Sequence, residues 1–266
     1  MNETLTRALS GVLYIFIIIS ATLYLNSFLI LFGILLLLSV NEFCELVKLP
    51  KIFPFILSTI FYFLFYYYFQ NRILEIILQL FYFIVAIKLL LFLFGNNDKK
   101  LDSFTKYSYL IGYIVIPFIL LAKLPFVDTL FNPKIIISLF ILIWFNDTMA
   151  YVVGKSIGKH KLMERISPKK TIEGFLGGIL FSVLISICIA QYYIHQPIIY
   201  WVLISLIVGV FGTLGDLIES KFKRVAGVKD SGKIMPGHGG ILDRLDSIIF
   251  AGPFVFLLYQ IFNYVS

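Results

Sequence analysis

Residues 197–224 read PIIYWVLISLIVGVFGTLGDLIESKFKR, an apolar run that ends in a mixed group of acids and bases. A helix of roughly 20 apolar residues crosses the hydrocarbon core of a bilayer, and residues 197–216 supply that length. Beyond them, Asp216, Glu219, Ser220 and Lys223 are spaced i, i+3, i+4 and i+7, so they share one helical face. This stretch therefore predicts a membrane helix that presents ionisable groups at its end.

The rest of the chain has the same apolar character. Its 266 residues are 60% hydrophobic and 14% charged, whereas soluble domains are about 45–50% apolar and about 25% charged. Continuous apolar length predicts spans at approximately 8–25, 27–44, 52–70, 73–94, 107–122, 134–153, 172–191, 197–216 and 240–263. The first span lacks a small-residue cleavage site, so we expect it to be retained. The fold class is therefore an all-α polytopic membrane protein with about nine transmembrane helices.

Basic residues predict the orientation of these spans. With a cytoplasmic N-terminus, 18 Lys and Arg residues fall on inside segments and 3 on outside segments. Arg7 and the pair Lys99 and Lys100 are among the inside residues. Because cytoplasmic loops carry the excess of Lys and Arg, the N-terminus is predicted inside and the C-terminus outside. In such a protein the net charge of +7 indicates contact with anionic lipid head groups and no nucleic acid.

The chain divides by chemistry near residue 140. Residues 1–140 are plain apolar spans suited to packing and lipid access, and whether two protomers meet there is left open. Residues 141–266 carry acids, glycines and bases in almost every loop, including two basic cytoplasmic loops. Cys44 and Cys188 lie in apolar runs without metal-ligand spacing, which argues against a disulfide or zinc site. We expect the active site in the C-terminal half.

Acidic residues gather at the cytoplasmic ends of the later spans. Asp147 lies near the end of the sixth span, Asp216 closes the eighth, and Asp243 and Asp246 open the ninth. Ionisable groups at membrane depth are costly and usually face a polar interior. Carboxylates from the end of one helix and the start of the next make an oxygen-rich site suited to Mg²⁺. Glu173, at the start of the seventh span, has an alternative role as a charge complementing the helix dipole.

Two basic loops lie beside these acids. In the segment KDSGKIMPGHGG (229–240), the helix-stopping Pro236 is followed by Gly237, Gly239 and Gly240, which favours a turn whose backbone N–H groups face an anion. His238 is positioned for phosphate contact or proton transfer, or for a structural hydrogen bond. The segment GKSIGKHK (154–161) does not match a P-loop. In SPKKTIEG (167–174), two lysines precede a helix expected to start at Thr171.

The run SKFKRVAGVKDSGKIMPGHGGILDRLD (220–246) resembles the signature of the phosphatidate cytidylyltransferase family. That pattern has a serine, a Lys-Arg pair, a Lys-Asp pair, then PGHGG, DR and a final D, and all of these positions are present. GDLIES (215–220), SPKKTIEG (167–174) and NDTMAYVVGK (146–155) also resemble the family. NEFCEL (41–46) is similar to a weaker acidic motif, with Asn41 where the family often has Trp, which leaves the role of Glu42 open.

The resemblance implies that CTP and phosphatidic acid react to CDP-diacylglycerol and pyrophosphate at the cytoplasmic face of a bacterial-type inner membrane. Mg²⁺ is the expected cofactor, and a second metal ion is left open. We assign metal ligation to Asp216 and Asp243, with Asp246 and Asp147 as further contributors. The other expected catalytic residues are Lys223, Arg224, His238 and Arg244. The expected substrate-binding residues are Lys169, Lys170, Ser220, Lys229, Asp230, Gly237, Gly239 and Gly240.

Two alternatives remain open. The same acids and bases would suit a related transferase acting on another lipid phosphate or a polyprenol, and acceptor assays separate the two. An ion-coupled transporter would instead show broken helices at mid-membrane and repeat symmetry between its halves. A CDP-alcohol phosphotransferase is disfavoured, because its D-x-x-D-G-x-x-A-R motif does not occur in this sequence.

Overall fold

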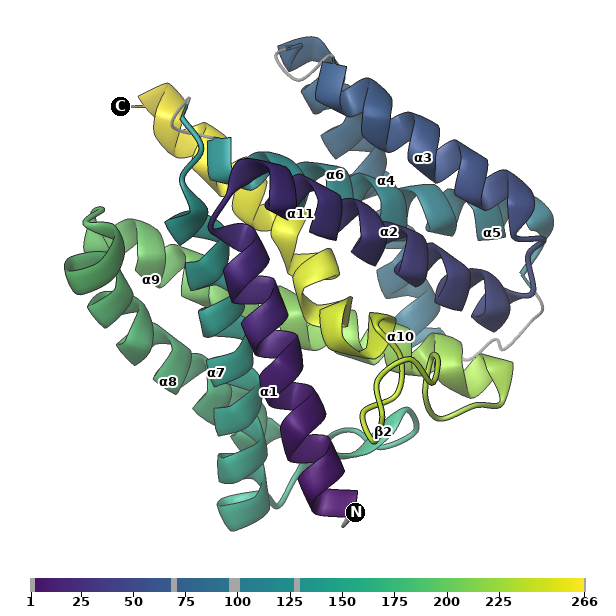
Figure 1. The fold of residues 1–266 in the computed structure, drawn as a ribbon. Coiled ribbons are helices and arrows are strands. Elements are labelled where there is room, and N and C mark those ends of the chain that lie inside the picture. The colour runs from purple at the N-terminus through teal and green to yellow at the C-terminus, as the bar shows by residue number, and fades with distance from the viewer. Residues whose placement is uncertain (1–2, 68–70, 96–100, 127–129, 266) are drawn as a thin grey trace. The chain divides into compact units, whose positions relative to one another are not determined.

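The structure is a computed structural model that describes residues 3–67, 71–95, 101–126 and 130–265 (Figure 1). The chain forms two compact units. The first unit contains residues 1–123 and 221–245, and the second contains residues 124–220 and 246–266. The chain passes from one unit to the other within α10 (Thr213–Ala226) and within α11 (Leu242–Val265).

The first unit is built from the N-terminal helices. They are α1 (Glu3–Thr22), α2 (Leu25–Val47), α3 (Ile52–Tyr67), α4 (Arg72–Phe94), α5 (Ser103–Tyr109), the π-helical turn η1 (Leu110–Val115) and α6 (Ile116–Lys123). Local sequence sets their ends. Asn71 accepts a hydrogen bond from the Leu74 backbone N–H and caps the start of α4, whereas Lys48 ends α2 in a left-handed conformation. Helices α2 and α3 pack against each other, and α4 leaves apolar side chains such as Ile73 and Leu91 exposed, as lipid contact requires.

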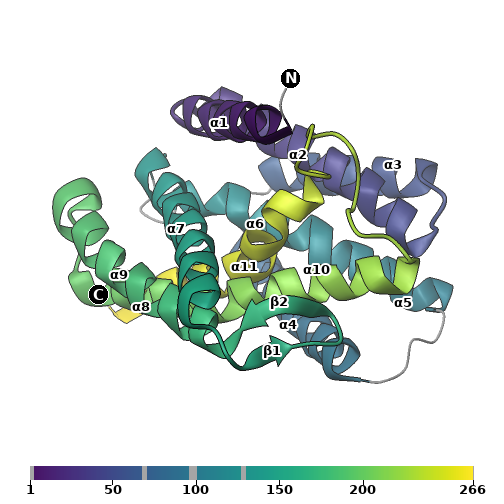
Figure 2. The ribbon, with the colours of Figure 1, turned by 90° about the horizontal axis from the view of Figure 1, so that it is seen from below.

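The second unit is a helical layer with one small hairpin (Figure 2). Its elements are η2 (Leu124–Phe126), α7 (Pro133–Ile157), β1 (Lys161–Met163), β2 (Ser167–Thr171), α8 (Ile172–Cys188), η3 (Ile189–Ile194), α9 (Ile198–Ile207) and η4 (Val208–Gly212). Helix α8 packs on α7 and on α9. The π-helical turns η3 and η4 interrupt the regular helix, and η4 leads directly into α10. Such turns are frequent at functional sites.

The helical fold class is confirmed, because 81% of the structure is helical and seven helices are long and apolar enough to cross a membrane. Two shorter apolar helices, Arg7–Thr22 and Ile52–Phe65, occupy the other two predicted spans within the described residues. Nine transmembrane helices and the N-inside orientation stay predictions. Lys99 and Lys100, which entered the charge count, and the end of the 52–70 span lie outside the described residues.

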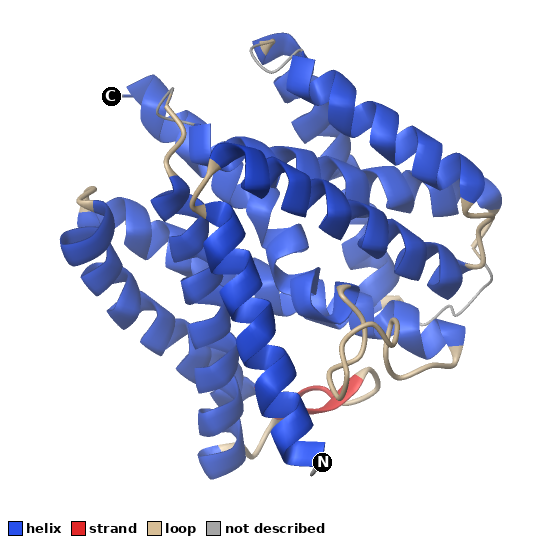
Figure 3. Ribbon diagram, in the orientation of Figure 1, coloured by secondary structure: helices blue, strands red, loops and turns tan. Residues whose placement is uncertain are grey.

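The helical fold includes one short β-hairpin that the sequence did not predict. Residues Lys161–Met163 and Ser167–Thr171 form an antiparallel two-stranded hairpin between α7 and α8 (Figure 3). The Glu173 carboxylate fixes this hairpin, since it accepts hydrogen bonds from the backbone N–H groups of Lys159 and His160 at 3.0 and 3.2 Å. Thr171 caps α8 by accepting a hydrogen bond from the Gly174 backbone N–H, so the helix begins where the sequence predicts. The hairpin thereby holds Lys169 and Lys170 in a defined strand.

The C-terminal half of α10 is buried in the first unit. Phe222 packs against Phe43 and Phe92, with ring centroids 5.3 and 4.9 Å away. Lys221 is only 2% exposed, and its ammonium donates hydrogen bonds to the Phe92 and Gly95 carbonyl groups at the end of α4. A cation at a helix C-terminus satisfies carbonyl groups that lack helical partners and complements the dipole. Lys221 therefore anchors α10, and this anchor positions the next turn of the helix.

Candidate active site

The segment from residue 227 to residue 241, called the signature loop below, is held to the first unit by Glu42 of α2. Glu42 is 1% exposed. Its carboxylate accepts hydrogen bonds from the backbone N–H groups of Ile241 and Leu242, at 2.9 and 2.8 Å, and from the Ser231 hydroxyl at 2.8 Å. The first two donors lie where α11 begins and need an acceptor, because the first N–H groups of a helix have no intrahelical partner. Glu42 thus ties Ser231 and the C-terminal end of the signature loop to α2.

Asp243, in the first turn of α11, is the second anchor of the signature loop. Its Oδ2 atom accepts hydrogen bonds from the Ser231 backbone N–H, the Ser231 hydroxyl and the Gly240 backbone N–H, at 2.9, 3.0 and 2.7 Å. Its Oδ1 atom accepts from the Lys223 ammonium at 2.6 Å. Both side chains of this ion pair are at most 10% exposed. The pair therefore connects α10, the signature loop and α11.

Two glycines allow this tight arrangement. Gly239 has a φ angle of +89°, and a Cβ atom there would lie 2.6 Å from Oδ2 of Asp243. A Cβ atom on Gly240 would overlap the Glu42 carboxylate. The sequence predicts that the backbone N–H groups of these glycines face a ligand, but those of Gly239 and Gly240 bond within the protein. The Gly239 N–H donates to the Met235 carbonyl at 3.2 Å and the Gly240 N–H to Asp243, because the loop and the start of α11 need these donors.

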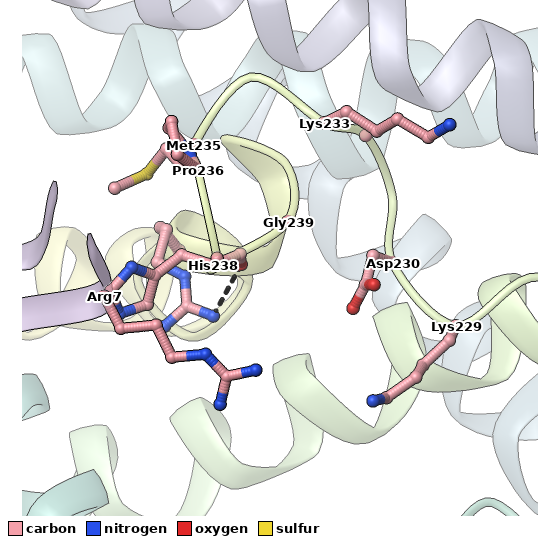
Figure 4. A pocket seen from close by; sticks show the side chains of 11 residues that line it. Arg7, Lys229, Asp230, Lys233, Met235, Pro236, His238 and Gly239 are labelled. Atoms are coloured by element: carbon pink, nitrogen blue, oxygen red, sulfur yellow. Dashed lines mark hydrogen bonds between the residues drawn. The ribbon is translucent and has the colours of Figure 1, made fainter. Parts of the chain in front are cut away.

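A pocket of about 510 Å³ lies on the signature loop, entirely within the first unit (Figure 4). Its charged lining residues are Arg7, Lys229, Asp230, Lys233 and Arg244, and its wall includes Pro236, Gly237, His238 and Gly239. Four cations against one carboxylate make it a site for an anion.

Two contacts hold His238 in the wall of this pocket. Its Nδ1 atom lies 2.7 Å from the Ser10 hydroxyl, and its carbonyl accepts a hydrogen bond from Arg244 at 2.9 Å. Burial and the nearby Arg244 and Arg7 cations lower the pKa of His238 below its usual value. The neutral ring is therefore favoured near neutral pH.

A second pocket, of about 900 Å³, lies along the same loop and the end of α2. It shares Lys229, Asp230 and Lys233 with the first pocket and adds Glu42 and Lys48 from the α2 side. Lys229, Asp230, Gly232 and Lys233 thus contribute to two cavities.

The second unit holds a separate cluster of ionisable groups. The Lys170 ammonium of β2 forms an ion pair with Asp216 of α10, and Asp147 and Asp246 also attract it. Burial acts to lower the pKa of Lys170, but the Asp216 carboxylate, assisted by Asp147 and Asp246, outweighs burial and raises it above the usual value. Ser220 donates a hydrogen bond to Asp216 at 3.2 Å. Three carboxylates predicted as metal ligands therefore face one cation.

The donor chemistry of this cluster suits Mg²⁺, although the described residues contain no group of three or more Asp, Glu, His or Cys close enough to enclose a metal. Mg²⁺ usually takes one or two carboxylates and completes its shell with water and substrate phosphates. Asp216, Asp147 and Asp246 fit that role. Asp243 fits it less well, because its two oxygens are already bonded to Lys223 and to three loop donors.

Comparison with known proteins places this chain in a family. The sequence model of the cytidylyltransferase family matches residues 5–262, which is nearly the whole chain. The chain belongs to the cytidylyltransferase family.

Curated members of this family are similar to half of the chain. A phosphatidate cytidylyltransferase of Staphylococcus epidermidis is 50% identical over 126 residues, 47% of this chain and 48% of that protein. That of Staphylococcus aureus is 50% identical over 125 residues, 46% of this chain and 48% of that protein. That of Bacillus subtilis is 53% identical over 125 residues, 46% of each chain. The alignments span about half the length of these curated relatives.

In this cytidylyltransferase-family chain, most of the predicted site residues lie in three groups: the cluster around Lys170, the buried pair and the cationic pocket. Asp147, Lys170, Asp216, Ser220 and Asp246 lie in the second unit, around Lys170 or Asp216. Asp243 and Lys223 form the buried pair of the first unit, and Lys229, Asp230, Gly237, His238, Gly239 and Arg244 line its pocket. The Gly240 backbone N–H instead donates a hydrogen bond to Asp243. Arg224 and Lys169 are exposed, and Arg224 donates a hydrogen bond to the Val228 carbonyl at 3.3 Å.

Three residues of the first unit were missed or left open. Glu42 anchors the signature loop, Ser10 contacts His238, and Arg7 lines the cationic pocket. The signal for Glu42 was a lone acid at the end of an apolar span, which is costly without partners. Ser10 and Arg7 gave no comparable signal, since both are ordinary residues at the start of a membrane helix.

A Glu42→Gln substitution tests the anchor. The amide keeps one acceptor oxygen but sets an NH₂ group against backbone donors, and a buried unsatisfied donor costs about 1–3 kcal/mol. We expect the variant to have a lower thermal unfolding midpoint in detergent, as measured by tryptophan fluorescence. Glu45→Gln is the matched control, because Glu45 lies on the same helix, is half exposed and has partners in exposed Lys51 and partly exposed Asn41. Equal midpoints for both variants would contradict the anchoring role.

Proposed function

We propose that this protein is a phosphatidate cytidylyltransferase, which converts CTP and phosphatidic acid into CDP-diacylglycerol and pyrophosphate. The observation that carries the proposal is family membership over residues 5–262, together with the names of relatives about 50% identical to half of the chain. The geometry supports it, since both units expose or enclose cations beside carboxylates, as a reaction between two phosphate compounds requires.

The reaction joins two anions. A phosphate oxygen of phosphatidic acid forms a bond to the α-phosphorus of CTP, and the bond from that phosphorus to the bridging oxygen of the β-phosphate breaks. Pyrophosphate leaves with the electron pair. A phosphate monoester is largely a dianion near neutral pH, because its second pKa is about 6. No strong general base is therefore needed, and the protein acts mainly by positioning and by charge stabilisation.

The paired lysines suit this chemistry. Lys170 beside Asp216 and Lys223 beside Asp243 are each held by a carboxylate, so their ammonium groups are fixed before substrate arrives. When phosphates bind, the same ammonium groups donate to phosphate oxygens while the carboxylates keep their orientation. The cationic pocket adds Lys229 and Arg244. Arg224 and Lys169, which are exposed, extend the positive surface for the approach of a polyanion.

Mg²⁺ is the proposed cofactor. When bound, it would neutralise phosphate charge and steady the leaving pyrophosphate. Asp216, with Asp246 and Asp147, would hold it, because these carboxylates already face a cation, the Lys170 ammonium. Asp243 would serve mainly to orient Lys223 and the signature loop.

The membrane setting follows from the substrates. CTP is soluble, whereas the acyl chains of phosphatidic acid remain in the bilayer, so the reacting phosphates must meet at the membrane surface. We propose nine transmembrane helices with the N-terminus and the site on the cytoplasmic side of the inner membrane, in agreement with the excess of basic residues on the segments predicted inside.

A substrate-omission assay tests the function. Detergent-purified protein with Mg²⁺, CTP and phosphatidic acid should release pyrophosphate and form CDP-diacylglycerol, and removing either substrate or adding EDTA should stop both. A polyprenyl phosphate in place of phosphatidic acid is the matched acceptor control. Turnover of the polyprenyl phosphate alone would overturn the proposal in favour of a transferase with another lipid acceptor.

A further inference from the structure

One face of the N-terminal helix α1 contacts the signature loop. Arg7 lines the cationic pocket, and Ser10 donates a hydrogen bond to the Pro236 carbonyl at 3.0 Å. An added Cβ atom on Gly11 would lie 3.5 Å from the His238 ring. Tyr14 donates a hydrogen bond to the Arg244 carbonyl at 3.4 Å. Positions 7, 10, 11 and 14 share one helical face, so α1 presents a continuous polar strip to the loop.

The opposite face of α1 is apolar and open. Leu9, Val12, Leu13 and Phe16 are each more than half exposed, as expected of a face that meets lipid. A helix that served only as a membrane anchor would need no polar strip. The division into two faces indicates that α1 has a second role at the loop.

The pocket beneath this strip concentrates positive charge. Figure 4 shows the side chains of Arg7 and Lys229 extending toward one another from two sides of the pocket, with the Asp230 carboxylate on the loop between them. Arg244 and Lys233 complete the charged lining. The lining therefore carries net positive charge, which favours a bound anion. Arg is the side chain best shaped for two parallel hydrogen bonds to a phosphate.

We propose that α1 completes a phosphate-binding site on the signature loop, in which Arg7 contacts the phosphate group of one of the two substrates. The proposal rests on the proposed function and adds a binding residue from the part of the chain that otherwise forms plain membrane spans. The phosphate belongs either to the lipid headgroup or to CTP, and the two are separated by the experiment below.

The state of His238 gives an independent readout. The Ser10 hydroxyl lies 2.7 Å from Nδ1 of His238, so α1 holds one nitrogen of the ring. A phosphate in the pocket would favour the protonated ring and raise the lowered pKa of His238. Loss of the Arg7 charge would raise it as well, even without ligand.

The test compares wild type with Arg7→Gln and Arg7→Lys in detergent micelles. Arg72→Gln, at the start of α4, is the control for losing one arginine outside the pocket. KM is measured for phosphatidic acid and for CTP separately. Hydrogen bonds to charged groups are among the stronger ones, so we expect Arg7→Gln to raise one KM by about tenfold or more with kcat little changed. Arg7→Lys should recover part of that increase, and the substrate whose KM rises names the source of the phosphate.

Binding is followed in parallel by the NMR signals of the three histidine rings, with His238→Gln to assign the His238 signal. In wild type, phosphatidic acid micelles or CTP should shift the His238 titration upward, and Arg7→Gln should abolish the ligand-dependent part. Unchanged KM values together with no ligand-dependent shift would overturn the phosphate site. Absence of turnover by wild type, with the NMR shift preserved, would instead overturn the proposed function and leave the site standing.

Discussion

An Asp243→Ala variant is expected to lose both stability and turnover. Its carboxylate lies within hydrogen-bonding distance of four donor groups, and its partner Lys223 is 8% exposed. Removing one partner of a buried ion pair leaves an uncompensated charge and costs about 3–5 kcal/mol. We therefore expect a large fall in the thermal unfolding midpoint and no measurable CDP-diacylglycerol formation. The two effects are read by tryptophan fluorescence in detergent and by pyrophosphate release.

A double variant separates the charge from the chemistry. Lys223→Met combined with Asp243→Leu removes both charges and keeps similar volume, and such replacements are often neutral or stabilising. We expect the unfolding midpoint to recover only in part, because the loop donors that Asp243 accepts stay unpaired, while turnover stays absent because the Lys223 ammonium is lost. Recovery of turnover in the double variant would show that the pair has no part in the reaction.

Asp216→Asn, in contrast, is expected to change stability little and to cause a large loss of activity. The Lys170–Asp216 pair is about 30% exposed, as the side-chain exposures of 28% and 31% indicate, and partly exposed pairs contribute about 0–1 kcal/mol. Removing a preorganised group that stabilises charge in the transition state lowers kcat by on the order of 10²–10³-fold. Initial rates at saturating CTP and phosphatidic acid measure this loss.

The control for Asp216→Asn is Glu164→Gln. Glu164 lies in the turn of the hairpin and is exposed, and its substitution also removes one acid from the same unit. Its rate should match wild type. If Asp216→Asn retained more than about a tenth of the wild-type rate, a loss well below that expected for one stabilising group, the assignment of Asp216 to the reaction would be wrong.

Apolar length predicted the helices well, because burial in lipid forces the backbone to satisfy its own hydrogen bonds and thus to be helical. The span predicted at 172–191 is Ile172–Ile194 in the structure, and that at 73–94 is Arg72–Phe94. The hairpin at 161–171 was missed, since its strands are short and polar and carry no alternation of apolar residues. The eighth span was expected to end at Asp216 but continues to Ala226, because Phe222 and Lys221 bury that helical turn.

The site could be predicted only as a set of residues. Spacing along α10 indicated that Asp216 and Ser220 share a face, and they are hydrogen-bonded. Spacing could not indicate that Glu42, 199 residues before Ile241, accepts its N–H group, since contacts between distant segments leave no periodic trace. It also could not show that Asp243 accepts hydrogen bonds from the loop as well as from Lys223, whereas Asp216 pairs with the Lys170 ammonium. That difference depends on donors of the backbone, which every residue type shares.

The Ser231 hydroxyl lies 2.8 Å from a Glu42 oxygen and 3.0 Å from an Asp243 oxygen. A hydroxyl carries a single hydrogen and can donate it to only one acceptor at a time. The signature loop therefore has two hydrogen-bond arrangements that differ by rotation about one Cβ–Oγ bond. In one the hydrogen goes to α2, and in the other it goes to α11. The Ser231 hydroxyl thus bonds either to the N-terminal helices or to the first turn of the last helix, one at a time.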